Sequence, residues 1–306
     1  MIRRIYRRLL GGVLTLLCVY TVTFLMVVTI PGNPFQTGER NMPPEAEAAL
    51  RARYHMDSNW SYFWEFLSGA IRGDFGPTFT YNDWTCNQVI ASALPVSILV
   101  GVSAVAVAVL IGVPLGVLAA VRRRTWVDAA ALSVTLVGVS VPSLVTGSVL
   151  LIVFAVLLKW APVGGWGSVA HLPLPVLTLS LPLIAYITRL MRVGMLDVLG
   201  SDYIRTAVAK GLSPRQVIWK HAFKPAFLPV LSYLGPATAS ALTGSFVVEK
   251  LFGVPGIGTH FVNAALNRDP GLIMSTVLVY STLLVVLNIA VDVLYAWVDP
   301  RIREAV

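Results

Sequence analysis

Residues 202–229 read DYIRTAVAKGLSPRQVIWKHAFKPAFLP, a basic segment with two prolines near its end that lies between two long apolar runs. Good helix formers over residues 203–210 predict a short helix, which Gly211 interrupts. Ser213 followed by Pro214 is typical of a helix start, with a hydroxyl cap and proline at the first helical position. A second short helix is expected to follow. Two short helices hinged on a glycine predict a compact knob outside the membrane, suited to a groove on a partner.

The chain as a whole is too apolar for a soluble domain. Its 306 residues are 56% hydrophobic and 12% charged, with a mean hydropathy of +0.76. A bilayer crossing needs about 20 apolar residues. Uncharged runs of that order predict six spans, at residues 9–30, 89–121, 129–158, 172–188, 226–248 and 272–291. We therefore expect an all-α, polytopic membrane protein with six transmembrane helices.

The net charge of +8 is unevenly distributed along the chain. If the N-terminus lies inside the cell, the inside segments hold 16 of the 23 Lys and Arg residues. The outside segments hold the other seven, which face nine acidic residues. This asymmetry is the positive-inside pattern of membrane proteins. It favours two cytoplasmic termini and argues against a nucleic-acid partner.

The first apolar run, at residues 9–30, follows an arginine-rich N-terminus as a signal peptide would. The run is longer than the apolar region of a signal peptide, so we expect a retained membrane anchor. Cys18 lies in this predicted span and Cys86 in the first outer loop. The two thiols are therefore not expected to form a disulfide.

An outer segment of 64 residues, 31–94, is predicted between the first two spans. Prolines and acidic residues open a predicted helix near residue 43. Farther along, five apolar side chains fall on one helical face: Trp60, Phe63, Trp64, Leu67 and Ile71. Two interpretations of this face stay open. It packs against the membrane surface or the outer span ends, or it contacts a substrate-delivering protein.

Residues 206–213 read TA-V-AKG-L-S and precede a basic, aromatic helix. This pattern resembles the cytoplasmic coupling loop of peptide-type ABC importer permeases, which docks the ATPase. The general permease pattern is Glu-Ala-Ala, three residues, Gly, nine residues and Ile-x-Leu-Pro, and only Ala207 and Gly211 match it. Other positions differ from this pattern in ways that resemble the peptide-transporting branch: Arg205 stands for Glu, Thr206 for the first Ala, His221 for Ile, and Phe223-Lys224 for Leu-Pro. Val208 departs even from that branch, where Arg is usual at this position.

By this resemblance the loop is implied to dock an ATPase subunit. The implied docking residues lie on both sides of the glycine: Tyr203, Arg205, Ala207, Lys210, Gly211, Leu212, Ser213, Pro214, Arg215 and His221. Residues that bind the substrate are not identified by the pattern.

Four further stretches resemble the B-type permease subunit of oligopeptide importers, and with the loop they cover essentially the whole chain. They are PGNPFQTGERNMPPE at 31–45, GDFGPTF at 73–79, FVVEKLFGVPGIGTHFVNAALNRD at 246–269 and DVLYAWVDPRIR at 292–303. The resemblance implies the type I ABC importer permease fold. Its implied parts are an added first helix (1–30), the outer segment (31–94), a transport domain (95–298) carrying the coupling loop at about 192–225, and a cytoplasmic C-terminus (299–306).

The same resemblance implies a subunit of the bacterial inner membrane that moves oligopeptides by alternating access. Its implied partners are a second, C-type permease subunit, two ABC ATPases, an extracytoplasmic peptide-binding protein and the lipid bilayer. A homodimer is the less favoured pairing. Dipeptides, nickel and other small solutes stay open as alternative cargo, because specificity in such importers rests largely on the binding protein.

Motifs that would carry chemistry are missing from the sequence. It contains no G-x-x-x-x-G-K-[ST] phosphate loop, no H-E-x-x-H and no G-x-S-x-G. We therefore expect no catalysis, cofactor or metal in this chain, with ATP and Mg²⁺ bound by partner subunits. An ion-coupled transporter is the alternative class, and it needs ionisable residues at membrane depth. Asp292 is the candidate, and its place near the last helix end favours a structural role.

Overall fold

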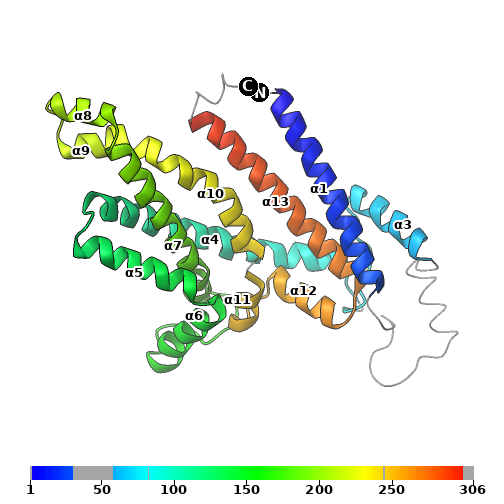
Figure 1. Ribbon diagram of the computed structural model, residues 1–306. Helices are drawn as coiled ribbons and strands as arrows, with labels where there is room; N and C mark the ends of the chain where they lie inside the picture. The colour runs from blue at the N-terminus through cyan, green and yellow to red at the C-terminus, as the bar shows by residue number, and fades with distance from the viewer. Residues whose placement is uncertain (1, 30–57, 82, 244, 299–306) are drawn as a thin grey trace. The chain divides into compact units, whose positions relative to one another are not determined.

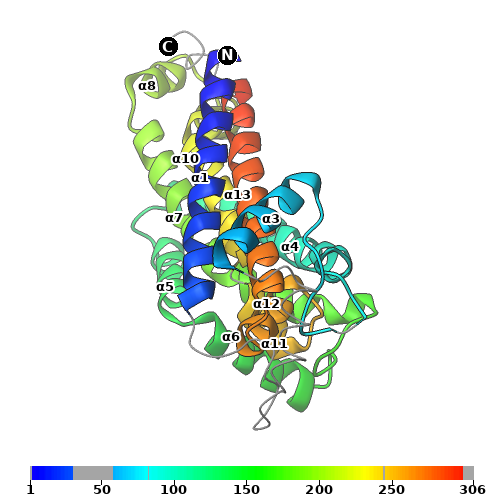
Figure 2. The ribbon, with the colours of Figure 1, turned by 90° about the vertical axis from the view of Figure 1, so that its right-hand side faces the viewer.

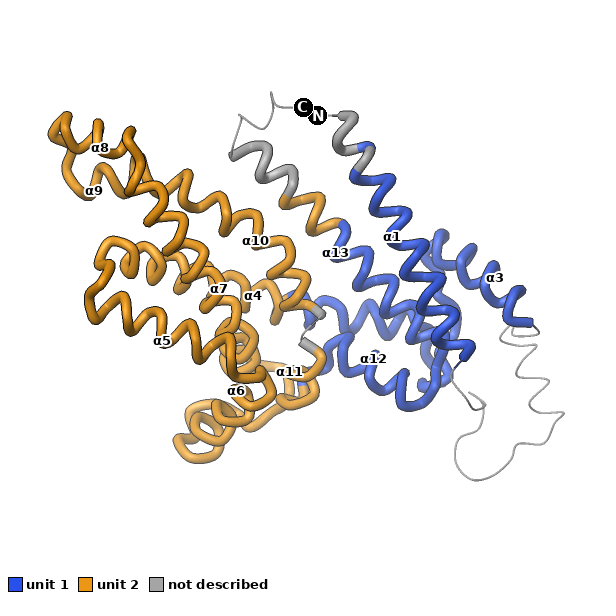
Figure 3. The backbone as a smooth tube through the Cα atoms, viewed as in Figure 1, with its two compact units in different colours: residues 1–98, 254–285 blue, residues 99–253, 286–306 orange. Residues whose placement is uncertain are grey.

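The computed structural model describes residues 2–29, 58–81, 83–243 and 245–298 (Figure 1). Within these ranges the elements are helices, and one isolated bridge joins Pro77 to Thr85. The chain forms two compact units, each made of two stretches of sequence (Figure 3). The first comprises residues 1–98 and 254–285, and the second comprises residues 99–253 and 286–306.

The first unit holds α1 (Ile2–Thr29), α3 (Asn59–Arg72), the beginning of α4 (Cys86–Val121), α12 (Ile257–Leu266) and the beginning of α13 (Pro270–Val298). Its core is aromatic. Tyr20 and Phe24 of α1 pack with Tyr62 and Phe66 of α3, and Met274 completes the cluster. The Ser58 hydroxyl caps the start of α3, and Gly73 ends the helix with a φ of +78°. In Figure 2, α3 lies against the side of α1.

A buried carboxylate fixes the loop that precedes α4. Asp269 is fully buried, and its side chain accepts hydrogen bonds from the Thr78 hydroxyl and the Thr80 backbone N–H. It also accepts from the backbone N–H groups of Phe79, at 2.8 Å, and of Leu272 in the first turn of α13, at 3.0 Å. One carboxylate therefore joins the segment around residue 79 to the start of α13.

The second unit is built around α7 (Pro173–Leu199), which contacts the helices on either side of it. Its other elements are α5 (Trp126–Ser140), α6 (Ser143–Leu150), η1 (Leu151–Leu157), η2 (Val169–His171), α8 (Asp202–Ala209), α9 (Pro214–Gln216), η3 (Val217–Ala222), α10 (Phe223–Thr243) and α11 (Ser245–Phe252). The core residues along α7 include Ile187, Met191 and Met195, all fully buried.

Small residues allow α4 and α7 to approach closely. Gly112 and Gly116 are one helical turn apart on α4, as in the small-xxx-small pattern of membrane helices. A Cβ added at Gly116 would lie 2.6 Å from both the Thr188 carbonyl oxygen and the Met191 Cβ. Backbone therefore packs against backbone here, and a larger residue at Gly116 would force the helices apart.

Four described helices are long and apolar enough to cross a membrane: Arg8–Thr29, Cys86–Val121, Val169–Leu199 and Pro270–Val291. A bent pair, Trp126–Ser140 with Ser143–Leu157, gives a fifth if it is one span. These five correspond to all of the predicted spans except the one at 226–248. The prediction of six helices is therefore confirmed only as four or five apolar spans among the described residues.

The predicted span at 129–158 is not one straight helix. It bends by 106° between Ser140 and Ser143. Pro142 stands at the break, where proline supplies no N–H and its ring blocks continuation of the helix. In the run predicted at 226–248, the structure describes α10 up to Thr243 and α11 from Ser245.

Two details of the outer segment differ from expectation. Cys86 is the first residue of α4 rather than a loop residue, although it and Cys18 are free thiols as predicted. The buried side of α3 carries Tyr62 and Phe66, whereas Trp60 and Trp64 of the predicted packing face are exposed. The predicted packing face was therefore only partly correct, because α3 buries a different side, the one that packs against α1. The helix predicted near residue 43 lies outside the described residues.

Ionisable groups inside the helices are more numerous than the sequence suggested. Asp128 in α5 and Glu249 in α11 are buried, and α7 extends beyond residue 188 to include Arg192. The role of Asp292 stays a prediction. Asp292 lies in α13, and the surroundings of its side chain are outside the described part of the chain.

Candidate functional site

The knob formed by residues 202–222 stands at the end of α7 that lies away from α6 (Figure 1). Its first helix, α8, buries one face. Ile204 and Ala207 are buried in the core cluster of the second unit, whereas Tyr203 and Val208 are exposed. Arg205 pairs with Asp202 at 3.2 Å, but both side chains are so exposed that the pair adds little stability. Burial of the inner face therefore holds α8 in place.

Gly211 makes the turn after α8. Its φ is +78°, and its N–H donates to the Val208 carbonyl at 2.9 Å. The Leu212 N–H donates to the Ala207 carbonyl at 3.3 Å, which completes the two hydrogen bonds of a Schellman motif. A Cβ added at Gly211 would meet no atom within 4 Å. Gly211 therefore interrupts the helix as predicted, in a left-handed conformation, and glycine is needed there for its backbone conformation rather than for space.

The helix after the turn begins with a capping box. The Gln216 N–H donates to the Ser213 hydroxyl, and the Gln216 side chain accepts from the Ser213 N–H. Pro214 occupies the first helical position, so the predicted helix start is confirmed. The helix is not short, however, because α9, η3 and α10 follow one another without a break over residues 214–243.

The π-helical stretch η3 lies just before the first proline inside this helix, Pro225. It ends three residues before Pro225, whose ring and missing N–H conflict with an ordinary α-helical turn. A π turn changes the local hydrogen-bond register, so the chain passes such a residue without ending the helix. The prediction of two short helices was therefore right for α8 and wrong for the second.

The structure places most of the predicted docking residues on the surface of the knob. The exposed ones are Tyr203, Arg205, Lys210, Gly211, Ser213, Pro214 and Arg215, while Leu212 and His221 are half-buried. Ala207 is buried and packs inside the knob, so it supports the knob rather than contacting a partner. The Tyr203 hydroxyl donates to the His221 carbonyl at 3.5 Å, which ties α8 to η3.

Two exposed apolar residues of the knob were missed. Val208 and Trp219 present large apolar surfaces next to the basic residues. A tryptophan within a basic, otherwise polar stretch was the signal for Trp219. A groove of about 730 Å³ at the base of the knob was also missed. It is lined by the ends of α4 and α7 as well as by α8, and these segments are far apart in sequence.

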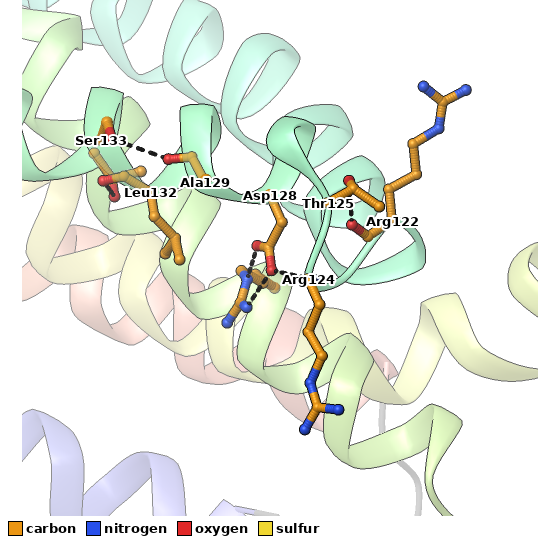
Figure 4. A network of polar contacts seen from close by, with 9 residues as sticks. Arg122, Arg124, Thr125, Asp128, Ala129, Leu132 and Ser133 are labelled. Carbon is orange, nitrogen blue, oxygen red and sulfur yellow. Dashed lines mark hydrogen bonds and ion pairs between the residues drawn. The ribbon is translucent and has the colours of Figure 1, made fainter.

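A largely buried ion pair links α5 to α7 (Figure 4). The Arg192 Nε donates to Asp128 Oδ1 at 2.6 Å, and its Nη2 donates to Oδ2 at 2.8 Å. The Arg124 backbone N–H donates to the same Oδ2 at 3.0 Å. Arg192 lies ten residues before Asp202, where the knob begins. The pair therefore fixes the stretch of α7 that leads into the knob.

No group of three or more His, Cys, Asp or Glu residues that could hold a metal occurs among the described residues. The site consists instead of exposed basic and apolar side chains on a knob that turns at Gly211 and is held in place by the buried inner face of α8. Exposed aromatic and basic side chains of this kind are enriched in protein–protein interfaces.

Two family models match this chain. Residues 112–304 match the binding-protein-dependent transport system inner membrane component, and residues 1–89 match its N-terminal part. The chain belongs to this family. The matched region of this inner membrane component includes α7, the knob and α10.

Relatives of this inner membrane component match it along their entire length. It is 46% identical over 306 residues to the oligopeptide transport system permease protein OppB of Salmonella typhimurium, covering 99% of this chain and 100% of that protein. It is 40% identical to the dipeptide transport system permease protein DppB of Bacillus subtilis, covering 99% and 98%. A chain of the inward-facing MetNI methionine ABC transporter aligns with a TM-score of 0.58 at 18% identity, covering 69% of this chain and 97% of that one. This last likeness shows the type I ABC permease fold.

Proposed function

We propose that this chain is the permease subunit of an ATP-driven importer that carries oligopeptides across the bacterial inner membrane by alternating access. The observation that carries this proposal is the 46% identity to an oligopeptide permease over 99% of the chain. Identity to the dipeptide permeases is lower, at 40% and 36%. Oligopeptides are therefore favoured over dipeptides as cargo.

The knob is the proposed docking site for an ABC ATPase. Its surface combines basic side chains, such as Arg205 and Lys210, with the exposed rings of Tyr203 and Trp219. Aromatic residues and arginine are enriched among residues that dominate protein–protein binding energy. The sequence has no phosphate-binding loop, so a partner has to hydrolyse the ATP. Residues 202–222 lie between α7 and α10 in the chain. They would therefore transmit movement of the ATPase to these two helices.

The complete importer proposed here contains a second, C-type permease, two ATPases and an extracytoplasmic peptide-binding protein. Both termini and the knob face the cytoplasm in this arrangement, as the distribution of basic residues favours. Thiol labelling tests it with a cysteine placed at exposed Thr125 or at exposed Asp83, both in a Cys18→Ser background. We expect a membrane-impermeant maleimide to label position 83 in intact cells and position 125 only after the membrane is opened. The reverse pattern would contradict the topology.

A transport assay tests the cargo. The chain is co-expressed with the products of its neighbouring genes, and the purified complex is reconstituted with the binding protein in vesicles that contain ATP. We expect ATP-dependent uptake of labelled tri- to pentapeptides to exceed uptake of dipeptides and of Ni²⁺. Preference for dipeptides or Ni²⁺ would correct the cargo but keep the importer. Uptake driven by an ion gradient without ATP would overturn the importer itself.

A further inference from the structure

Helix α3 has three distinct faces. The first, with Tyr62, Phe66 and the half-buried Phe63, packs against α1. A second face is apolar and exposed: Trp60 is 67%, Trp64 53% and Ile71 79% exposed. Residues spaced by four and seven positions share one side of a helix, so these three side chains form a single stripe. An exposed apolar stripe of this kind is a site for another apolar surface.

The third face of α3 is polar and lines a cavity. Glu65, Ser68 and Arg72 border a pocket of about 370 Å³ that the segment around residues 74–79 closes from the other side. The polar face thus has a cavity of mixed polar and aromatic lining next to it, and the apolar stripe faces elsewhere. Ionisable residues at membrane depth ordinarily face such cavities and not lipid.

The contacts with α1 give the depth of α3 relative to the membrane. Phe63 packs on both Tyr20 and Phe24 of α1, with ring centroids 4.9 and 5.0 Å apart. Phe66 lies on Tyr20, at 6.2 Å. At about 1.5 Å per residue, Tyr20 and Phe24 lie about 14 and 8 Å from the end of α1 at Thr29. One leaflet contributes about 15 Å of hydrocarbon.

Helix α3 is therefore packed beside the half of α1 that lies within one leaflet. Side chains of α1 at the same depth, such as Val22, Leu25 and Met26, are also exposed and apolar. These side chains lie on the side of α1 away from α3, and the stripe on α3 presents a second exposed apolar surface at the same depth. An occupant that covers both has to be apolar and extended, as acyl chains are.

We propose that α3 is a lipid-embedded helix that occupies one leaflet beside α1, with Trp60, Trp64 and Ile71 facing acyl chains. The two tryptophans lie at the N-terminal end of α3. Their neighbours Tyr62 and Phe63 contact Phe24, which is nearer than Tyr20 to the Thr29 end of α1. Tryptophan is enriched at that level, where the membrane meets water. Under the topology proposed above this is the outer leaflet, so the outer segment is partly a membrane element. The placement itself requires only that α1 spans the bilayer.

Spin labels on the full chain in lipid nanodiscs test this placement. Single cysteines replace Trp60, Trp64 or Ile71 on the stripe, and Ser61 or Arg72 on the polar side, in a Cys18→Ser background. The parent chain labelled at exposed Cys18 of α1 serves as the lipid standard, and buried Cys86 is checked to stay unlabelled. Power-saturation spectroscopy then compares collisions with oxygen, which dissolves in lipid, and with a nickel chelate, which stays in water.

We expect oxygen collisions to exceed nickel collisions at the stripe and at Cys18, and the reverse at Ser61 and Arg72. Nickel collisions that dominate at the stripe while Cys18 behaves as lipid-facing would overturn the embedded helix. A stripe shielded from both reagents would also overturn it, in favour of a protein partner such as a substrate-delivering protein. Water exposure at Cys18 would instead contradict α1 as a span and so the proposed function. Ile71, the most exposed of the three, keeps the test valid if a tryptophan replacement fails to fold.

Discussion

Arg192 donates two hydrogen bonds to the carboxylate of Asp128, from Nε at 2.6 Å and from Nη2 at 2.8 Å. The side chains are 20% and 7% exposed, so the pair is largely removed from water. The residues are 64 positions apart in sequence, and their contact joins the first turn of α5 to α7. A two-point contact between planar groups fixes orientation as well as distance.

Removing one partner of this pair is expected to cost more than removing both. Arg192→Ala leaves the buried Asp128 charge without its partner, and Asp128→Ala leaves the half-buried Arg192 charge without its partner; each loss costs up to about 3–5 kcal/mol. The double variant leaves no unpartnered charge, so its loss of stability is expected to be well below the sum of the losses of the two single variants. Thermal unfolding of the solubilised protein measures all three. Asp202→Ala with Arg205→Ala, an exposed pair, is the matched control, and additive small effects are expected there.

Gly116→Leu is expected to separate α4 from α7. A Cβ at Gly116 would lie 2.6 Å from a backbone oxygen of α7, which cannot rotate away as a side chain could. Overpacking of this kind costs about 1–3 kcal/mol, and several degrees of melting temperature are expected to be lost. Gly11→Leu in α1 is the control, because a Cβ there meets no atom within 4 Å. Equal melting temperatures for the two variants would show that the close contact is unimportant.

Asp269→Asn is expected to loosen the segment before α4. The amide loses one acceptor oxygen and brings donor hydrogens toward the Phe79 and Thr80 N–H groups. Hydrogen bonds to a charged group are worth about 1.5–3 kcal/mol each, so local opening is expected to become at least about tenfold more frequent.

The native thiol of Cys86 reports this opening. It is buried and donates to the Pro77 carbonyl at 3.4 Å, next to the loop that Asp269 holds. In a Cys18→Ser background, maleimide labelling of Cys86 is expected to accelerate in Asp269→Asn and to stay slow in Asp83→Asn, at an exposed turn. An unchanged rate in Asp269→Asn would mean that the carboxylate does not hold the loop.

Local signals in the sequence were sufficient for the turn of the knob. Gly211 and the Ser213–Pro214 pair each act within one helical turn, so their roles are readable without the fold. Long apolar runs likewise gave most of the spans. The break at Pro142 was not predicted, because membrane helices tolerate proline where neighbouring helices satisfy the freed backbone groups.

Contacts between distant segments could not be read from the sequence. The pairing of Asp128 with Arg192 and the hub at Asp269 depend on how helices pack in space. Ala207 matched a family pattern, and only the structure shows that it faces inward. On α3, periodicity identified an apolar face, but the helix has a second apolar side against α1, and periodicity does not say which side is buried.

Co-purification of the ATPase subunits with tagged Gly211→Val tests whether the knob at residues 202–222 docks the ATPase. A β-branched residue at a φ of +78° costs about 1–2 kcal/mol, so a knob that binds in its observed shape loses about five- to thirtyfold in affinity.

Gly73→Val is the matched control for this measurement, since Gly73 has the same φ and equally open surroundings at the end of α3. If the knob docks the ATPases, Gly73→Val retains them, whereas Gly211→Val inserts in the membrane but loses most of them. Full retention of the ATPases by Gly211→Val, or equal loss in both variants, would contradict docking at the knob.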